Sequence, residues 1–278
     1  MTLPTLSPAR LEFAREVRQA DANISLERAA FWIAAEVESG LDLEIYEQRL
    51  DRLAATVEPL LPAERYPLRV VKAINTVLFE QEGFRGNRDR YYDPLNSFVP
   101  IVLERRTGIP ITLSLIYCAI AQRLDFPMVG IGMPGHFLIR PDFAEANIFI
   151  DAFHAGEILF PEDCEARLAQ VYGRSVPLQP EFLEPVSKRQ WLVRMLTNLK
   201  AIYLSQNDFI QTLAAVERIL LVDPKSVSAL RDRGLLNYQL QNWSAARQDL
   251  QTYLQPAPTA PDRLPITDLL RQLETQDG

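Results

Sequence analysis

The sequence predicts an α+β protein with a helical N-terminal region, a core of one helix and several short strands, and an all-helical C-terminal tail. Three observations support this prediction. Apolar residues recur at helical spacing from residue 8 to about residue 80. Short strand-like segments separated by turn formers follow between residues 128 and 153, and helical spacing returns from Trp191 onward. We therefore expect two domains, residues 1–185 and residues 186–278.

The N-terminal region is expected to be helical because its apolar residues form one-sided stripes. Ser25 is a favourable N-cap for the apolar run from Leu26 to Val37. A later helix is expected over residues 67–79, where four apolar side chains share the inward face. These four residues are Val70, Val71, Ile74 and Leu78.

The segment from residue 83 to residue 100 is rich in Gly, Asn, Asp and Pro, which predicts a structured loop. Two interpretations are open. In the first, the loop is a binding surface that carries Arg85, Asn87, Tyr92 and Asn96. In the second, it is a capped connector whose Asn and Asp side chains bond to nearby backbone groups.

A helix followed by three strands is expected at the centre of the chain. Pro110 suits the first turn of a helix, where its missing N–H is not needed. The strands are expected at Met128–Met133, His136–Arg140 and Ile148–Phe153, with turns at Pro134-Gly135 and Pro141-Asp142 between them.

The composition restricts the class of protein. The formal net charge is −7, and the acidic and basic residues are interleaved, so a nucleic-acid partner is disfavoured. The first residues lack a basic and apolar signal-peptide pattern, and no stretch has the ~20 apolar residues that span a bilayer. Two cysteines and two histidines fit neither a disulfide framework nor a zinc spacing. We expect a cytoplasmic protein with no metal, no cofactor and no membrane contact.

The C-terminal region shows a repeat of the tetratricopeptide length. Pro224 and Pro258 are 34 residues apart, and the second unit is degenerate, since Arg233 and Asn237 stand where large apolar residues are expected. Two units fall short of the roughly three that stack stably. We therefore expect the tail to pack on the preceding domain or on a protein partner, after which a proline-rich spacer covers residues 256–261. The large positions of the first helix are filled by Leu196, Leu199 and Tyr203.

Three residues could carry chemistry together. Thr112 lies in the first turn of the expected helix, His136 on a strand and Asp151 on the next strand, with spacings of 24 and 15 residues. If the two strands pair antiparallel, His136 and Asp151 meet at one end, and we expect all three residues to face one cleft. His154 follows three residues after Asp151 and either lines the same cleft or bonds to backbone in a turn.

Four segments resemble a known family when they are taken together: Phe84–Asn87, Tyr92–Ser97, Leu103–Leu113 and Gly135–Arg140. They are similar to the SirB-one family, and the similarity spans roughly residues 27–255. This resemblance implies a transglutaminase-like domain, which shares its architecture with papain and in which a helix packs on an antiparallel sheet, followed by tetratricopeptide repeats. In active members of the superfamily, a cysteine at the helix N-terminus is the nucleophile, a histidine activates it and an aspartate orients the histidine.

The nucleophilic cysteine is missing here, because Thr112 matches its position. An internal threonine is a poor nucleophile, since it lacks the free amine that activates N-terminal threonines. Cys118 is six residues further along, which corresponds to ~600° of rotation and ~9 Å of rise, so it points elsewhere. Cys164 is flanked by acids, which raise a thiol pKa.

Two functional hypotheses follow. The first is a non-catalytic protein-binding or scaffold module that contacts an unknown protein partner through its helical repeats. The alternative is a hydrolase or acyl transferase that uses Thr112, His136 and Asp151. If the cleft keeps the geometry of an active site, a cysteine introduced at Thr112 would have a depressed pKa.

Overall fold

The fold is described by a computed structural model, which covers residues 7–143, 147–255 and 261–276. The chain divides into two compact units, Met1–Trp191 and Leu192–Gly278, and each is described by itself. The predicted α+β class is confirmed, with a helical N-terminal region, a small antiparallel sheet and a helical C-terminal region. None of the helices in the described ranges is both long and apolar enough to cross a bilayer.

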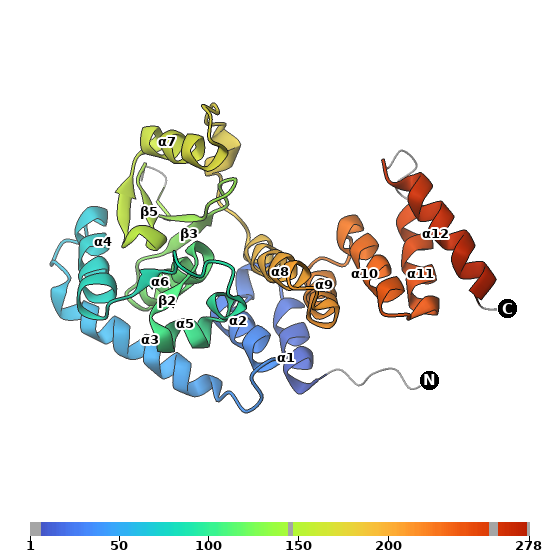
Figure 1. The fold of residues 1–278 in the computed structure, drawn as a ribbon. Coiled ribbons are helices and arrows are strands. Elements are labelled where there is room, and N and C mark those ends of the chain that lie inside the picture. The colour runs from blue at the N-terminus through green and yellow to red at the C-terminus, as the bar shows by residue number, and fades with distance from the viewer. Residues whose placement is uncertain (1–6, 144–146, 256–260, 277–278) are drawn as a thin grey trace. The chain divides into compact units, whose positions relative to one another are not determined.

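Five helices form the N-terminal half of unit 1 (Figure 1). Ser25 caps the second of them as predicted, since its hydroxyl accepts the backbone N–H of Arg28. The inward face predicted for residues 67–79 is confirmed, because all four of its apolar side chains are buried. The helices are α1 (Pro8–Val17), α2 (Leu26–Ala35), α3 (Leu43–Val57), α4 (Pro67–Asn75), which continues as a π-helix over Thr76–Gln81, and α5 (Val99–Arg105).

A four-stranded antiparallel sheet follows, in the order β3-β4-β5-β6. The three predicted strands are present in shorter form, and the hairpin partner β6 was not predicted. Ile139 of β4 pairs with Ile150 of β5, which confirms the antiparallel arrangement expected for these two strands. The strands are β3 (Met128–Ile131), β4 (Leu138–Pro141), β5 (Phe149–Asp151) and β6 (Glu157–Leu159).

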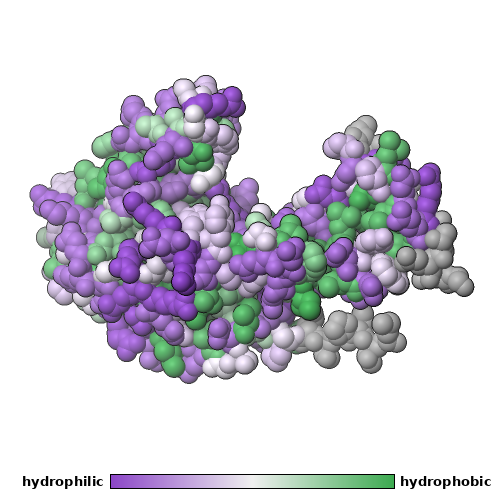
Figure 2. Space-filling view, in the orientation of Figure 1, coloured by the Kyte–Doolittle hydropathy of each residue, from purple (hydrophilic) through white to green (hydrophobic). Residues whose placement is uncertain are grey.

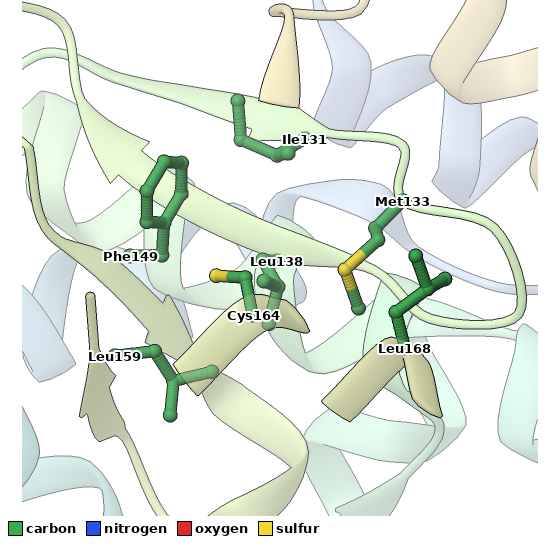
Figure 3. Close-up of a cluster of buried hydrophobic side chains, with 7 residues drawn as sticks. All are labelled: Ile131, Met133, Leu138, Phe149, Leu159, Cys164 and Leu168. Carbon is green, nitrogen blue, oxygen red and sulfur yellow. The ribbon is translucent and has the colours of Figure 1, made fainter. Parts of the chain in front are cut away.

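Two helices pack on the sheet. Helix α6 (Pro110–Arg123) begins at Pro110, as predicted, and contacts β3 and β4. Helix α7 (Pro161–Tyr172) packs on the sheet through a buried apolar cluster (Figure 3). Successive side chains of a strand point to opposite faces, so both faces of the short strands are covered. The cluster consists of Ile131, Met133, Leu138, Phe149, Leu159, Cys164 and Leu168.

The loop between α4 and α5 is held against the turn that follows β5. Strand β1 (Arg85–Gly86) pairs in parallel with β2 (Thr107–Gly108). At Gly86 a side chain would be impossible without a shift, because an added Cβ would lie 2.5 Å from the ring of Phe153. The short 3-10 turn η5 (Ala152–His154) carries that phenylalanine, so the loop is positioned beside the end of β5.

Unit 2 is helical throughout its described residues. The apolar positions predicted for its first helix are confirmed, since Leu196, Leu199 and Tyr203 are buried. The two polar residues of the degenerate repeat form polar contacts: Arg233 pairs with Asp249 at 2.6 Å, and the buried Asn237 bonds to Asn242. The predicted proline-rich spacer lies almost entirely outside the described residues. The helices are α8 (Lys188–Ser205), which begins in unit 1, α9 (Phe209–Val222), α10 (Val227–Gln239), α11 (Trp243–Leu254) and α12 (Arg263–Gln276).

Candidate functional site

A histidine and an aspartate meet at the end of the sheet. His136 lies in the turn that precedes β4, where its backbone N–H donates to the carbonyl of Met133. Its Nε2 lies 2.7 Å from Oδ2 of Asp151, and only 8% of the histidine remains exposed. The structure therefore brings together two of the three residues proposed from the sequence, although the histidine stands just before the strand and not within it.

Asp151 ends β5 and is completely buried. Its Oδ1 accepts the backbone N–H groups of Phe153 at 3.1 Å and of His154 at 3.2 Å, which caps η5. Its Oδ2 is also 2.8 Å from Nδ1 of His154. Burial alone would raise the pKa of this carboxyl, but the hydrogen bonds and charges of His136 and then of His154 outweigh burial and lower the pKa. The group is thus held as a carboxylate.

Arg167 of α7 completes the cluster, and the sequence analysis missed it. Its Nη2 lies 3.7 Å from Oδ2 of Asp151 and 2.7 Å from a carboxylate oxygen of Glu157. Its Nη1 lies 3.2 Å from Nδ1 of His154. The carboxylate of Asp151 is therefore shared by His136, His154 and Arg167. The sequence of α7 does not predict this contact, because the contact depends on how α7 packs on the sheet.

Among the residues that the structure describes, three members of this cluster form the one group that could hold a metal ion. One ligand atom each from His136, Asp151 and His154 lies within 4.8 Å of the other two. However, Oδ2 of Asp151 already faces both rings, and the guanidinium of Arg167 stands 3.7 Å from it. A fixed cation at that distance opposes the binding of a second cation.

Thr112 is the third residue of α6 and is fully buried. Its hydroxyl donates to the carbonyl of Asn96 at 2.8 Å and accepts the backbone N–H of Ile109 at 3.2 Å. The second bond satisfies one of the free amides at the helix N-terminus, as a capping-box side chain does. The hydroxyl is therefore bonded to the main chain, while its placement in one cleft with His136 remains a prediction.

Two of the proposed binding residues bond within their own loop. Nδ2 of Asn87 donates to Oδ1 of Asn96 at 2.9 Å, and Nδ2 of Asn96 donates to the carbonyl of Arg90 at 2.7 Å. Arg85 is exposed, and Tyr92 is 72% exposed. The loop thus has the internal amide bonds that the connector interpretation predicts, and it exposes Arg and Tyr side chains, whose role in binding stays a prediction.

An aromatic chain connects this loop with the histidine site. The ring of Tyr91 lies 5.9 Å from that of Phe153, and Phe153 lies 6.5 Å from His136 and 5.2 Å from His154. The edge-on geometry of these pairs is the one that aromatic rings favour. The loop therefore borders the His136–Asp151 site.

Neither cysteine is activated. Cys118 keeps some surface exposure on α6, but the packing around its sulfur raises its pKa far above the usual value. Burial in the α7 cluster, followed by the charge of Asp163, raises the pKa of Cys164 to about 12. Thiols with raised pKa values are almost fully protonated near neutral pH and are poor nucleophiles.

Two models of known protein families match successive parts of the chain. A family model described as the transglutaminase-like superfamily matches residues 44–197, and a tetratricopeptide repeat model matches residues 199–271. A UPF0162 protein of Xylella fastidiosa (strain 9a5c) is 36% identical over 246 residues, which is 86% of each chain. A UPF0162 protein of Vibrio cholerae is 30% identical over 79% of this chain and 81% of its own.

A shorter similarity extends to a eukaryotic protein. F-box only protein 21 of Mus musculus is 43% identical over 110 residues, which is 37% of this chain and 18% of that protein. No solved structure matches the chain.

Proposed function

We propose a function from the premise that this chain belongs to the UPF0162 family and to the transglutaminase-like superfamily: it acts in the cytoplasm as a non-catalytic protein-binding or scaffold module. The observation that carries this proposal is the state of Thr112. The resemblance to the superfamily places the nucleophile at Thr112, yet the hydroxyl of this residue is buried and bonded to Asn96 and Ile109. The side chain serves the start of α6 and not a substrate.

The remaining groups of the site support the same conclusion. In a catalytic triad, a histidine accepts the proton of the nucleophile, and a carboxylate that bonds to this histidine alone raises its basicity. Here the carboxylate of Asp151 lies close to three side chains, those of His136, His154 and Arg167, so it does not serve His136 alone. The two thiols of the chain offer no substitute, because both have raised pKa values.

The helical repeats support the binding part of the proposal. Unit 2 contains a cavity of about 500 Å³ between α8, α9 and α10. Leu204 and Leu235 line it and stay partly exposed, beside a Lys200–Asp232 ion pair of 2.8 Å. Figure 2 shows hydrophobic residues at the surface of this unit among hydrophilic ones. Stacked helix pairs bind partners on such grooved surfaces.

The catalytic part of the proposal is tested with the purified full chain. We expect no transfer of a labelled amine to a glutamine-rich protein, and no ester or amide hydrolysis, above the rate of a His136→Ala variant. Turnover that depends on both His136 and Thr112 would contradict the proposal. It would favour the alternative hydrolase or acyl transferase, for which the 2.7 Å contact between His136 and Asp151 is the supporting observation.

The binding part is tested by quantitative affinity capture with the full chain. A Leu204→Glu/Leu235→Glu variant places charge in the groove and should lose its specific partners. The matched control is Ile210→Glu, because Ile210 is 69% exposed but does not line the groove. If both variants retain the same partners as the unmodified chain, the groove is not the binding surface.

A further inference from the structure

The loop over residues 83–93, here called the Arg-Tyr loop, carries a local excess of positive charge. Arg85, Arg88 and Arg90 are exposed, and none of them forms an ion pair with another described residue. Two nearby acids pair with arginines outside the loop. Glu82, which directly precedes the loop, lies 2.8 Å from Arg106, and Asp93, the last loop residue, lies 3.9 Å from Arg105. Within the loop only Asp89 remains to offset the three arginines, although the whole chain has a net charge of −7.

The frame of the Arg-Tyr loop holds these side chains in place. Asn87 and Asn96 bond to each other and to the loop backbone, and Arg85 lies on strand β1. Tyr91 is anchored on Phe153. A surface that is already ordered loses less conformational entropy when a partner binds.

Two aromatic rings complete the surface. Tyr92 stands 5.3 Å from Tyr91 in an edge-on arrangement and is the more exposed of the two. Tyrosine adds apolar contact area and a hydroxyl to an interface at little entropic cost. Arginine and tyrosine are both enriched in protein interfaces.

We propose that the Arg-Tyr loop binds an acidic peptide segment of a partner protein. Guanidinium groups form paired hydrogen bonds with carboxylates, and none of the three arginines forms such a pair with a described residue. A short acidic segment senses mainly the local charge, because solution ions screen charges beyond ~8 Å at physiological salt. A long nucleic acid would instead meet the repulsion of a chain with net charge −7. The proposal concerns unit 1 and is independent of binding by the repeats.

The test measures binding of a fluorescent peptide of alternating Asp and Glu to the full chain by anisotropy. We expect saturable binding that weakens as salt is raised. The variant Arg85→Gln/Arg88→Gln/Arg90→Gln should bind about 10-fold or more weakly, since three exposed ion pairs are lost together. The same peptide built from Asn and Gln should not bind.

The matched control removes three other exposed arginines that form no ion pair within the described residues, Arg18, Arg52 and Arg174. It changes the net charge equally and should bind the acidic peptide like the unmodified chain. Equal weakening in both variants, or no binding at low salt, would overturn the proposal.

Two further results would assign this surface to a different binding partner and would therefore also overturn the proposal of an acidic peptide. The first is a single-stranded RNA of equal length that displaces the peptide. The second is a self-associated chain that dissociates on gel filtration when the three loop arginines are replaced. Unchanged thermal melting of the loop variant would confirm that its fold is intact.

Discussion

Replacing Thr112 with valine tests whether the hydroxyl of this residue is structural. Valine keeps the branched shape of threonine and replaces only the hydroxyl with a methyl group. The change removes the acceptor of the Ile109 N–H and the donor to the Asn96 carbonyl, both at a buried position. The segment between α4 and α5, which contains Asn96, would lose one of its attachments to α6.

The expected loss of stability follows from the two backbone groups that Thr112→Val leaves without a hydrogen-bond partner. A buried donor or acceptor that loses its partner costs about 1–3 kcal/mol, and no cavity is created because the volume is conserved. We therefore expect Thr112→Val to lower the free energy of unfolding of unit 1 by about 1–3 kcal/mol. Thr112→Ser retains the hydroxyl and loses a methyl group, which costs about 1 kcal/mol by a different mechanism.

Stability and hydrogen exchange distinguish these two variants. Urea unfolding gives the free-energy change, and amide exchange reports the Ile109 N–H directly. Thr112→Val should accelerate exchange at Ile109, whereas Thr112→Ser should leave it protected. If Thr112→Val matches the unmodified chain in both measurements, the hydroxyl has no structural role and is available for chemistry.

Three other changes test the site and its surroundings. Asp151→Ala leaves buried groups unpaired and should cost about 3–5 kcal/mol in urea unfolding, against less than about 0.5 kcal/mol for the exposed control Asp89→Ala. Because the folded pKa of Asp151 is lowered, its stabilisation is present above the unfolded pKa of about 3.9 and should fade as pH falls through the lower folded value, which an acid titration of stability would reveal. Cys164, with its pKa near 12, should react with iodoacetamide far more slowly than a free thiol at pH 8, and a fast reaction would revive a thiol mechanism. Gly86→Ala should destabilise unit 1 by about 1–3 kcal/mol, as thermal melting would show, because the new methyl group meets the ring of Phe153.

Local features of the chain were predictable from sequence. Pro110 marks the start of α6 because proline lacks a backbone N–H and its ring clashes with a preceding helical turn, so it is tolerated only in the first turn. The positions of β3, β4 and β5 followed from short apolar segments between turn formers. Both signals lie within a few neighbouring residues, so they need no knowledge of tertiary packing.

Features that depend on packing between distant segments were not predictable. The bond from Thr112 to Asn96 joins residues 16 positions apart and requires the loop to fold over the helix. Arg167 reaches Asp151 only because α7 packs across the sheet. From the sequence, Thr112 is interpreted as a residue that replaces the nucleophilic cysteine. The structure adds that its hydroxyl bonds to Ile109 and Asn96 at the start of α6.

The shared carboxylate gives the His136–Asp151 pair a structural role within a site proposed to be non-catalytic. In a catalytic arrangement the aspartate serves one imidazole, and its charge raises the basicity of that ring. Asp151 instead binds two imidazoles and two backbone amides, with a guanidinium close by. These contacts join the turn before β4, the end of β5, the η5 turn and α7. Removing Asp151 should therefore disrupt the junction of these four segments, which is a structural role that requires no reaction.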